Sequence, residues 1–381
     1  MDVATADEGL SPWEIAEKYT KAFLEDADAL NIERADEYPR ATDHIPEMIE
    51  LTRTLIERGH AYEVGGTVYF DVRSFPDYGK LSGNTLERLR AGHRQELEVD
   101  PNKRHHADFA LWKRAGENRL MKWDSPWGPG FPGWHVECSA MSMKYLGDRF
   151  DVHTGGQDLK FPHHEDEIAQ SESAVGHPVV SIWVHGGVLQ MSGKKMAKSA
   201  RNITRVSELA EQGVDPLAYR LLLFGTRYRR EMDFEWDALE AAHHRLTTLR
   251  QRMADWRTET DVETDGSADE YDQRFRSAVA DDLDMPQALV VLNEAVSSDR
   301  LSDPSKYRLL ASWDQVLGLD LVRLAVEGQA IPEDVQALVR ERDDARAAKD
   351  YARSDAIRDR LTAMGWEVMD TSGGTKVRRK A

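Results

Sequence analysis

The segment that most constrains the fold of this chain lies between residues 150 and 185. A short apolar stretch at 150–153 is followed by Gly155 and Gly156, by helical periodicity near 163–174, and by a second apolar stretch at 179–185. A strand, a crossover helix and a second strand in this order are typical of a β-α-β unit, because parallel strands need a long connection. The sequence therefore predicts part of a parallel α/β domain here.

The flanking regions carry helix and hairpin signals. Ser11 and Glu14 match a helix-capping box, and apolar spacing predicts a helix over 46–58. Alternating residues around a Gly-Gly pair predict a hairpin over 61–70. From about residue 205 the pattern is mainly helical. We therefore expect an α/β part followed by an all-α part.

Composition limits the classes of function. The chain has 381 residues, with 68 acidic and 50 basic side chains and a net charge of -18. This excess argues against an extended basic surface for polyanions, although a local one remains compatible with it. No apolar run reaches the roughly 18 residues of a membrane span. The single cysteine, Cys138, excludes an internal disulfide framework and indicates a reducing, cytoplasmic compartment.

Cys138, His163 and Glu167 form a candidate metal site. His163 and Glu167 stand at i and i+4, so they would share one face of a helix. Thiolate, imidazole and carboxylate all bind Zn²⁺, and three protein ligands leave a position open for substrate. Each residue alone also fits core packing or a surface ion pair, and residues 164–166 offer alternative ligands.

A lysine cluster is a second candidate site. Three of the 15 lysines, Lys194, Lys195 and Lys198, fall within five residues, and Ser199 follows them. Flexible ammonium groups with hydroxyl and backbone donors suit a phosphate ligand. A solvated basic turn is the alternative interpretation.

Two further features suit a small ligand. Gly155 and Gly156 follow the first predicted strand, where α/β proteins bind nucleotides, although a tight turn would use the same residues. The tryptophan-rich loop that ends at Trp134 could line a pocket or could serve packing alone.

Taken together, these segments resemble the cysteinyl-tRNA synthetases, a family of class I aminoacyl-tRNA synthetases. The likeness extends over nearly the whole chain. The matching stretches are residues 132–141, 151–159, 161–172, 195–199 (KMAKS for the family's KMSKS), 282–289 and 349–359.

The resemblance implies a fold and a reaction. It implies the C-terminal half of a class I Rossmann-type catalytic domain with a connecting insertion, then a helical anticodon-binding bundle and a small terminal subdomain. The reaction is ATP-dependent activation of cysteine, with Mg²⁺ accompanying the ATP, and transfer to tRNA(Cys). The implied roles are Zn²⁺ ligation by Cys138, His163 and Glu167, contact with substrate cysteine by Trp134, catalysis by Lys195 and Lys198, and ATP binding by Gly156, Asp158, Lys195, Met196, Lys198 and Ser199.

The expected regions follow the same resemblance. They are a connective segment (1–120), the second Rossmann half with the zinc site (121–190), the KMSKS-loop and stem-contact region (191–240), the anticodon bundle (241–330) and a C-terminal subdomain (331–381).

Three departures from the family pattern stand out. Ala197 replaces the first serine of KMSKS, and Phe131 stands where a basic residue is usual. The family's first Rossmann half, with its HIGH signature and first zinc cysteine, is not matched, so we expect the chain to begin just after it. Two alternatives follow, namely a non-catalytic fragment that binds tRNA or zinc or pairs with a separately encoded N-terminal half, and a related ligase that joins cysteine to an amino-sugar.

Overall fold

The structure, a computed structural model, describes residues 9–89, 100–191, 194–195, 204–257, 266–322, 332–371 and 374–379. The chain divides into two units. The first comprises residues 1–22, 34–196 and 228–233, and the second comprises residues 23–33, 197–227 and 234–381.

An antiparallel sheet occupies the early part of the first unit. The predicted hairpin is confirmed, because Ala61 pairs with Phe70 and Val64 with Thr67. Gly65 and Gly66 both have positive φ, which suits a two-residue hairpin turn. In sheet order, the strands are β1 (Ala61–Val64), β2 (Thr67–Phe70), β3 (Phe109–Arg114) and β4 (Gly130–Pro132).

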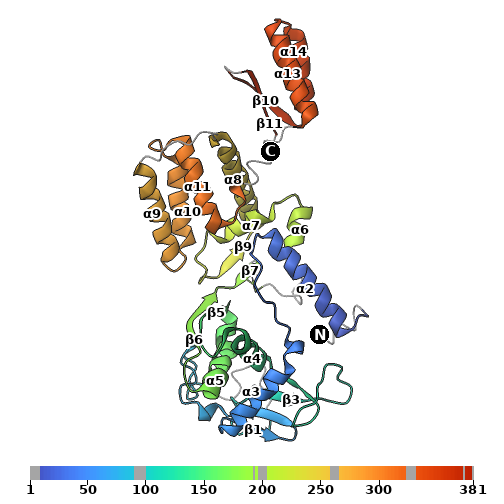
Figure 1. Ribbon diagram of the computed structural model, residues 1–381, viewed down its shortest axis with the longest axis vertical. Helices are drawn as coiled ribbons and strands as arrows, with labels where there is room; N and C mark the ends of the chain where they lie inside the picture. Colours follow the sequence, from blue (N-terminus) through green and yellow to red (C-terminus); the bar gives the residue numbers. More distant parts are fainter. Residues whose placement is uncertain are drawn as a thin grey trace. The chain divides into compact units, whose positions relative to one another are not determined.

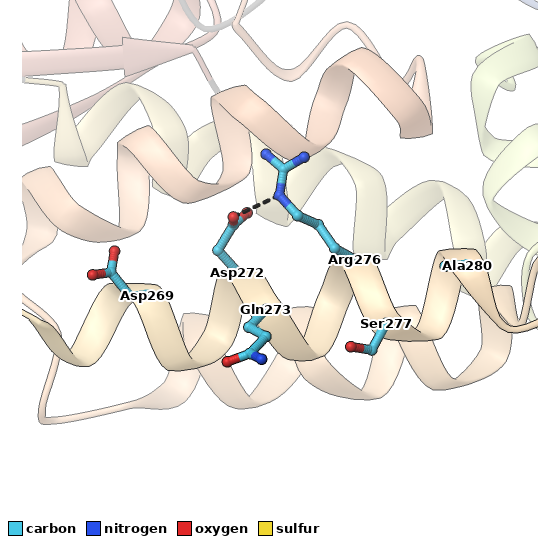
Figure 2. A pocket seen from close by; sticks show the side chains of 6 residues that line it. All are labelled: Asp269, Asp272, Gln273, Arg276, Ser277 and Ala280. Atoms are coloured by element: carbon cyan, nitrogen blue, oxygen red, sulfur yellow. Dashed lines mark hydrogen bonds and ion pairs between the residues drawn. The ribbon is translucent and has the colours of Figure 1, made fainter.

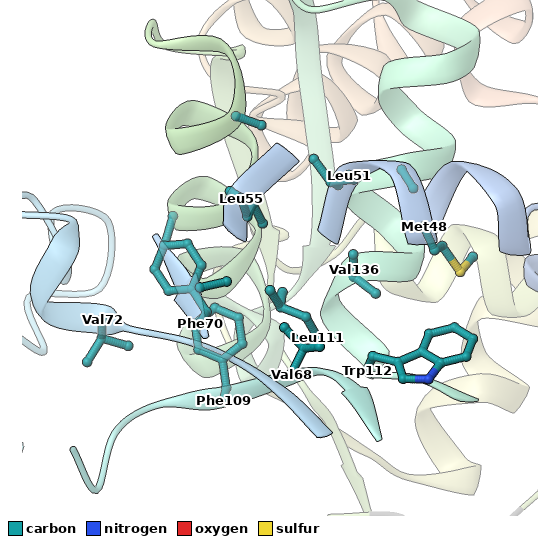
Figure 3. Close-up of a cluster of buried hydrophobic side chains, with 14 of the residues drawn as sticks. Met48, Leu51, Leu55, Val68, Phe70, Val72, Phe109, Leu111, Trp112 and Val136 are labelled. Atoms are coloured by element: carbon teal, nitrogen blue, oxygen red, sulfur yellow. The ribbon is translucent and has the colours of Figure 1, made fainter. Parts of the chain in front are cut away.

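The core of the first unit lies between this sheet and two helices. The predicted second helix is confirmed as α3 (Ile45–Glu57), and its Met48 and Leu55 are fully buried. Figure 3 shows these side chains facing Phe70 and Leu111 from the sheet and Val136 from α4 (Trp134–Leu146). The sheet thus supports α4, which carries Cys138.

The parallel unit is also present. β5 (Phe150–Gly156) and β6 (Val180–Gly186) pair in parallel, as predicted. The crossover helix α5 (Glu165–Val175) begins later than expected, because the preceding segment Lys160–His164 forms an irregular turn in which Phe161 has extended backbone angles. Residues Gln157–Leu159 add one short 3-10 turn between β5 and this segment.

Short elements complete the first unit. Two 3-10 turns span Ala41–Asp43 and Val72–Ser74. A small sheet in the order β8-β7-β9 consists of β7 (Leu189–Met191), β8 (Lys194–Lys195) and β9 (Met232–Phe234).

The second unit is mainly helical, which confirms the expected change from α/β to all-α. In Figure 1 the four helices α8 to α11 lie side by side, and Phe275 stacks on Trp313 at 4.4 Å between ring centroids. Between residues 204 and 320 its helices are α6 (Val206–Glu211), α7 (Pro216–Leu223), α8 (Trp236–Trp256), α9 (Gly266–Ala280), α10 (Met285–Ser297) and α11 (Asp303–Leu317).

The first described helix, α2 (Pro12–Ala29), contributes residues to both units. The predicted capping box is confirmed, because the Ser11 amide donates to the Glu14 carboxylate at 2.8 Å and the Glu14 amide donates to Ser11 Oγ at 3.3 Å.

The C-terminal residues have a core of their own. Val335, Leu361 and Trp366 are buried together. The elements are α13 (Glu333–Ala347), α14 (Tyr351–Ala363) and the antiparallel hairpin of β10 (Trp366–Thr371) and β11 (Gly374–Arg379). None of the helices in the described ranges has the length and apolar content that crossing a membrane requires.

Candidate functional site

Three potential metal ligands come together in the first unit. Cys138 lies in α4, His163 in the irregular turn before α5, and Glu167 in the first turn of α5. Their ligand atoms all lie within 4.8 Å of one another. His163 Nε2 is 3.1 Å from Glu167 Oε1, although the two residues do not share one continuous α-helix. The structure therefore brings together the three residues that the sequence singled out.

The surroundings of Glu167 fit a cation. Its side chain is buried, and within the described part of the chain the contact of Oε1 with His163 Nε2 at 3.1 Å lacks hydrogen-bond geometry, so Oε1 has no hydrogen bond. A buried carboxylate oxygen without a hydrogen bond is costly, and a metal ion would compensate it. Sulfur, nitrogen and carboxylate ligands with the sulfur from cysteine are those that Zn²⁺ prefers. The donor set thus fits zinc.

The ionisation of Cys138 depends on whether a cation is bound. Burial, followed by the nearby carboxylates of Glu167 and Glu137, raises the pKa of the Cys138 thiol to about 12. Burial also raises the pKa of Glu137 to about 7. A thiol in these surroundings remains protonated at neutral pH unless a cation stabilises the thiolate.

A second group shares Glu167 and was not predicted as a site. Ligand atoms of His153, His164 and Glu167 also lie within 4.8 Å of one another. Burial, followed by three neighbouring imidazoles, lowers the pKa of His164 to about 3, and His164 Nδ1 is 2.9 Å from His185 Nε2. A Cβ on Gly155 would lie 2.6 Å from the His164 ring, so the glycine gives that ring its space. The sequence had offered His164 as an alternative ligand, but it gave no signal that His153 would lie beside it.

A further pair of side chains orients His163. His135 Nδ1 lies 2.8 Å from His163 Nδ1, and His135 Nε2 lies 3.2 Å from Asp166 Oδ2. Partners of this kind fix the ring orientation of a metal-binding histidine. Trp134 is 57% exposed and its ring lies 4.3 Å from that of His163, so an aromatic wall stands beside the candidate metal site.

The predicted nucleotide residues are only partly described. Gly156 ends β5, and a Cβ there would lie 2.5 Å from Asp158 Oδ1, so the carboxylate folds over the glycine. The backbone of Lys195 pairs with Gln190 between β8 and β7. Outside the described residues lie Met196, Ala197, Lys198 and Ser199. The structure thus places the glycine and the aspartate close together, next to the histidine group.

The departure at Phe131 has a structural counterpart. The guanidinium carbon of Arg119 lies 3.4 Å from the centroid of the Phe131 ring. An arginine stacked in this way is held by a cation–π interaction. A positive charge is therefore present at this position although residue 131 itself is apolar.

A separate hollow lies along α9 in the second unit (Figure 2). Asp272 pairs there with Arg276 at 2.6 Å and accepts a hydrogen bond from Trp313 Nε1 at 3.0 Å. It is lined by two carboxylates, Asp269 and Asp272, and one guanidinium, Arg276, and its residues come from one helix face. These properties are typical of a surface hollow rather than a catalytic site.

Comparisons with known proteins agree on one family. Residues 3–244 match the tRNA synthetases class I (C) catalytic domain, and residues 329–378 match the cysteinyl-tRNA ligase anticodon binding domain. The chain is 45% identical to a cysteine–tRNA ligase of Thermus thermophilus over 97% of its length and 80% of the relative's. It is 42% identical to a cysteine–tRNA ligase of Chlorobium chlorochromatii over 96% and 80%.

A solved structure shares the fold of this chain. Methionyl-tRNA synthetase of Mycobacterium tuberculosis in complex with methionyl-adenylate aligns with a TM-score of 0.55 over 85% of this chain and 79% of that one. At 18% identity this likeness shows a shared fold. The α/β part that carries the candidate metal ligands therefore has the fold of a class I synthetase catalytic domain.

Proposed function

The chain belongs to the cysteine–tRNA ligase family of class I aminoacyl-tRNA synthetases, and from this premise we propose that it activates cysteine with ATP and transfers the cysteinyl group to tRNA(Cys). The observation that carries the proposal is the convergence of Cys138, His163 and Glu167. A thiol substrate is recognised best by a thiophilic metal, and these residues offer the ligands for one.

We propose that Cys138, His163 and Glu167 hold a zinc ion. A bound zinc ion supplies a ligand position that favours a thiolate over the hydroxyl of serine. His135 keeps the ring of His163 in place by its hydrogen bond. The exposed Trp134 lies beside His163 and would form a wall of the pocket for the cysteine side chain.

The activation step places charge on phosphate oxygens. The carboxylate of cysteine attacks the α-phosphate of Mg²⁺-ATP, an aminoacyl-adenylate forms and pyrophosphate leaves. Lys195 and Lys198 would stabilise the added negative charge. We assign the remaining ATP contacts to Gly156, Asp158, Met196 and Ser199. A ribose hydroxyl at the 3′ end of the tRNA then attacks the adenylate carbonyl, and AMP leaves.

The regional assignment is part of the same proposal. Residues 1–120 would form the connective segment, 121–190 the second Rossmann half, 191–240 the KMSKS-loop and stem-contact region, 241–330 the anticodon bundle and 331–381 the terminal subdomain. We also propose a cytoplasmic location, on the basis of the single cysteine and the supply of tRNA.

One surface favours an additional polypeptide partner. Val152 and Ile182 are direct neighbours across β5 and β6, and they are 48% and 56% exposed. Parallel strands are normally covered on both faces. We propose that a separately encoded N-terminal half of the catalytic domain covers this pair. Pyrophosphate exchange should then rise when a recombinant N-terminal half from a relative is added, and Val152→Asp should prevent the rise. No response to the added half would contradict this proposal.

Zinc binding and cysteine activation are tested on separate readouts. Metal analysis of the purified chain should give about one zinc, Cys138→Ala should lose it, and Ser142→Ala, one turn along α4, should keep it. ATP–pyrophosphate exchange with cysteine, and its absence with serine, tests activation. Undiminished zinc in Cys138→Ala would refute the ligand set.

The molecule that accepts the cysteinyl group distinguishes a tRNA ligase from an amino-sugar ligase. The comparisons give no support to an amino-sugar ligase, and residues 329–378 match an anticodon binding domain. Cysteine should therefore become attached to tRNA(Cys) and not to an amino-sugar when both are offered, and the reverse would contradict the proposal.

A further inference from the structure

Glu165 is a buried carboxylate that the proposed chemistry does not use. It is the first residue of α5, its exposure is 0%, and it lies between the two candidate ligands His163 and Glu167. Its oxygens turn toward a loop of the connective segment. Oε1 accepts from the Gly79 amide at 2.9 Å and from the Leu81 amide at 3.4 Å, and Oε2 accepts from the Ser82 amide at 2.8 Å.

The loop Tyr78–Ser82 is shaped for this carboxylate. Successive backbone N–H groups in a tight turn form a concave site for an anion, and here a side chain of the same protein fills it. Gly79 has φ +97°, and a Cβ there would lie 2.6 Å from the Asn84 carbonyl oxygen. Any other residue at this position would distort the turn.

Two more contacts join the same loop to the same helix. The Tyr78 hydroxyl donates to Asp166 Oδ1, and Lys80 Nζ lies 2.5 Å from Glu172 Oε2. The loop therefore contacts Glu165 and Asp166 in the first turn of α5, and Glu172 further along the helix. Of these three, Glu165 is the residue that accepts three backbone hydrogen bonds from the loop.

The local backbone explains why such support is needed. His163 lies in the irregular turn, where Phe161 interrupts helical geometry, so an α-helix does not by itself fix His163 relative to Glu167. A metal site requires its ligands within a few tenths of an ångström of their proper distances. Residues that fix the positions of the metal ligands therefore affect metal affinity although they do not bind the metal themselves.

We propose that Glu165, clamped by the backbone of the loop Tyr78–Ser82, is a positioning residue for the metal ligands His163 and Glu167. The inference rests on the proposed zinc site and adds the element that shapes it. The connective segment would thus set the geometry of the catalytic half through backbone donors rather than through ligands of its own.

The test compares zinc affinity in three variants of the full chain. Glu165→Gln keeps the size but places an amide N–H₂ against backbone N–H groups, so it should lower zinc affinity about 10- to 100-fold in competition with a chromophoric chelator. Glu172→Gln removes the negative charge that pairs with Lys80 on the same helix and should keep wild-type affinity. Gly79→Ala disturbs the clamp from the loop side and should lower affinity as Glu165→Gln does.

Two further readouts separate positioning from simple loss of stability. In the cobalt-substituted protein, Glu165→Gln should shift the thiolate-to-cobalt charge-transfer band, and Glu172→Gln should not. The KM for cysteine should rise more than the KM for ATP. If Glu165→Gln does not fold, the zinc affinity and cobalt spectrum of Gly79→Ala test the positioning role instead.

The outcomes also distinguish this inference from the proposed function. Wild-type protein that binds no zinc would overturn the metal site itself. Wild-type protein that binds zinc, together with Glu165→Gln and Gly79→Ala of unchanged affinity and cobalt spectrum, would overturn the positioning role alone.

Discussion

The two units of this molecule both have apolar cores, and they differ in the ionisable side chains that they bury. In the first unit the residues from His163 to Glu167 are consecutive, polar and each at most 3% exposed. In the second unit the helices α8 to α11 pack aromatic and aliphatic side chains such as Leu246, Phe275 and Trp313. Buried ionisable groups need specific partners, whereas apolar groups need only volume and shape.

This difference indicates which unit carries chemistry. Buried carboxylates and imidazoles cost stability unless they are hydrogen-bonded or bind an ion, and their pKa values are readily shifted. The first unit buries such groups at the candidate metal ligands. Among its described residues, the helical bundle has no comparable run of consecutive buried ionisable side chains. The two units should therefore respond differently to substitution and to pH.

The largest effect is expected in the apolar bundle. Phe275 is 2% exposed and stacks on Trp313, so Phe275→Ala should reduce the free energy of unfolding by about 3–5 kcal/mol through lost burial and a residual cavity. Denaturant unfolding at pH 7.5 and pH 6 measures the change, and Phe275→Leu serves as the milder control. The loss should be the same at both pH values. A strong pH dependence would contradict purely apolar stabilisation.

A substitution of a buried polar residue in the first unit should reduce the free energy of unfolding by almost as much. Asp108 is fully buried and accepts hydrogen bonds from the Tyr62 hydroxyl at 2.6 Å, the Val72 amide at 3.1 Å and the His105 amide at 2.9 Å. Asp108→Asn places an N–H₂ group against one of these donors and should cost about 2–3 kcal/mol. Tyr62→Phe removes one donor only and should cost about 1 kcal/mol. Equal, small losses in both variants would show that the carboxylate is dispensable.

Acid should weaken the first unit selectively. Burial lowers the pKa of His164 to about 3, and burial also lowers the pKa values of His60 and His105. Because these pKa values are depressed in the folded state, the unfolded chain takes up more protons at these histidines below about pH 6.5, so their contribution to stability falls as pH decreases. Glu137, whose pKa burial raises to about 7, contributes in the opposite direction. The slope is at most about 1.4 kcal/mol per pH unit for His164, and less for the partly exposed His60 and His105.

Hydrogen–deuterium exchange of the zinc-free protein at pH 7.5, 6.5 and 5.5 localises this effect. Peptides from 150–186 should lose protection as the pH falls, while peptides from 285–317 should change little. His164→Gln should flatten the dependence in the first unit. Parallel loss of protection in both sets of peptides would remove the contrast between the units.

Much of the fold could be predicted from local sequence signals. The Ser11–Glu14 capping box, the Gly65-Gly66 hairpin and the β5-α5-β6 unit depend on nearby residues or simple periodicity. The start of α5 was misplaced because helical spacing cannot show that Phe161 takes extended angles. His135 was not predicted because its role depends on contacts with His163 and Asp166, 28 or more residues away.

The candidate ligands were predictable for a different reason. Cys138 is the single cysteine, so a thiolate ligand had one possible source. The role of Glu165 was not predictable, since its partners come from a loop more than 80 residues earlier. Residue type thus indicated the chemistry, while the supporting contacts required the three-dimensional structure.

The smallest effect is expected for a surface ion pair of the bundle. Arg274 Nη2 lies 2.5 Å from Glu294 Oε2, with side chains 39% and 46% exposed. Arg274→Met keeps the apolar stem and removes the charge, so it should change the free energy of unfolding by less than about 0.5 kcal/mol, because water screens such pairs. Urea unfolding in low and high salt measures this. We expect a carboxylate to matter for stability where it is buried, as Asp108 is, and not merely where it forms an ion pair. A loss comparable to that of Asp108→Asn would contradict this and would mean that the second unit also depends on exposed charges.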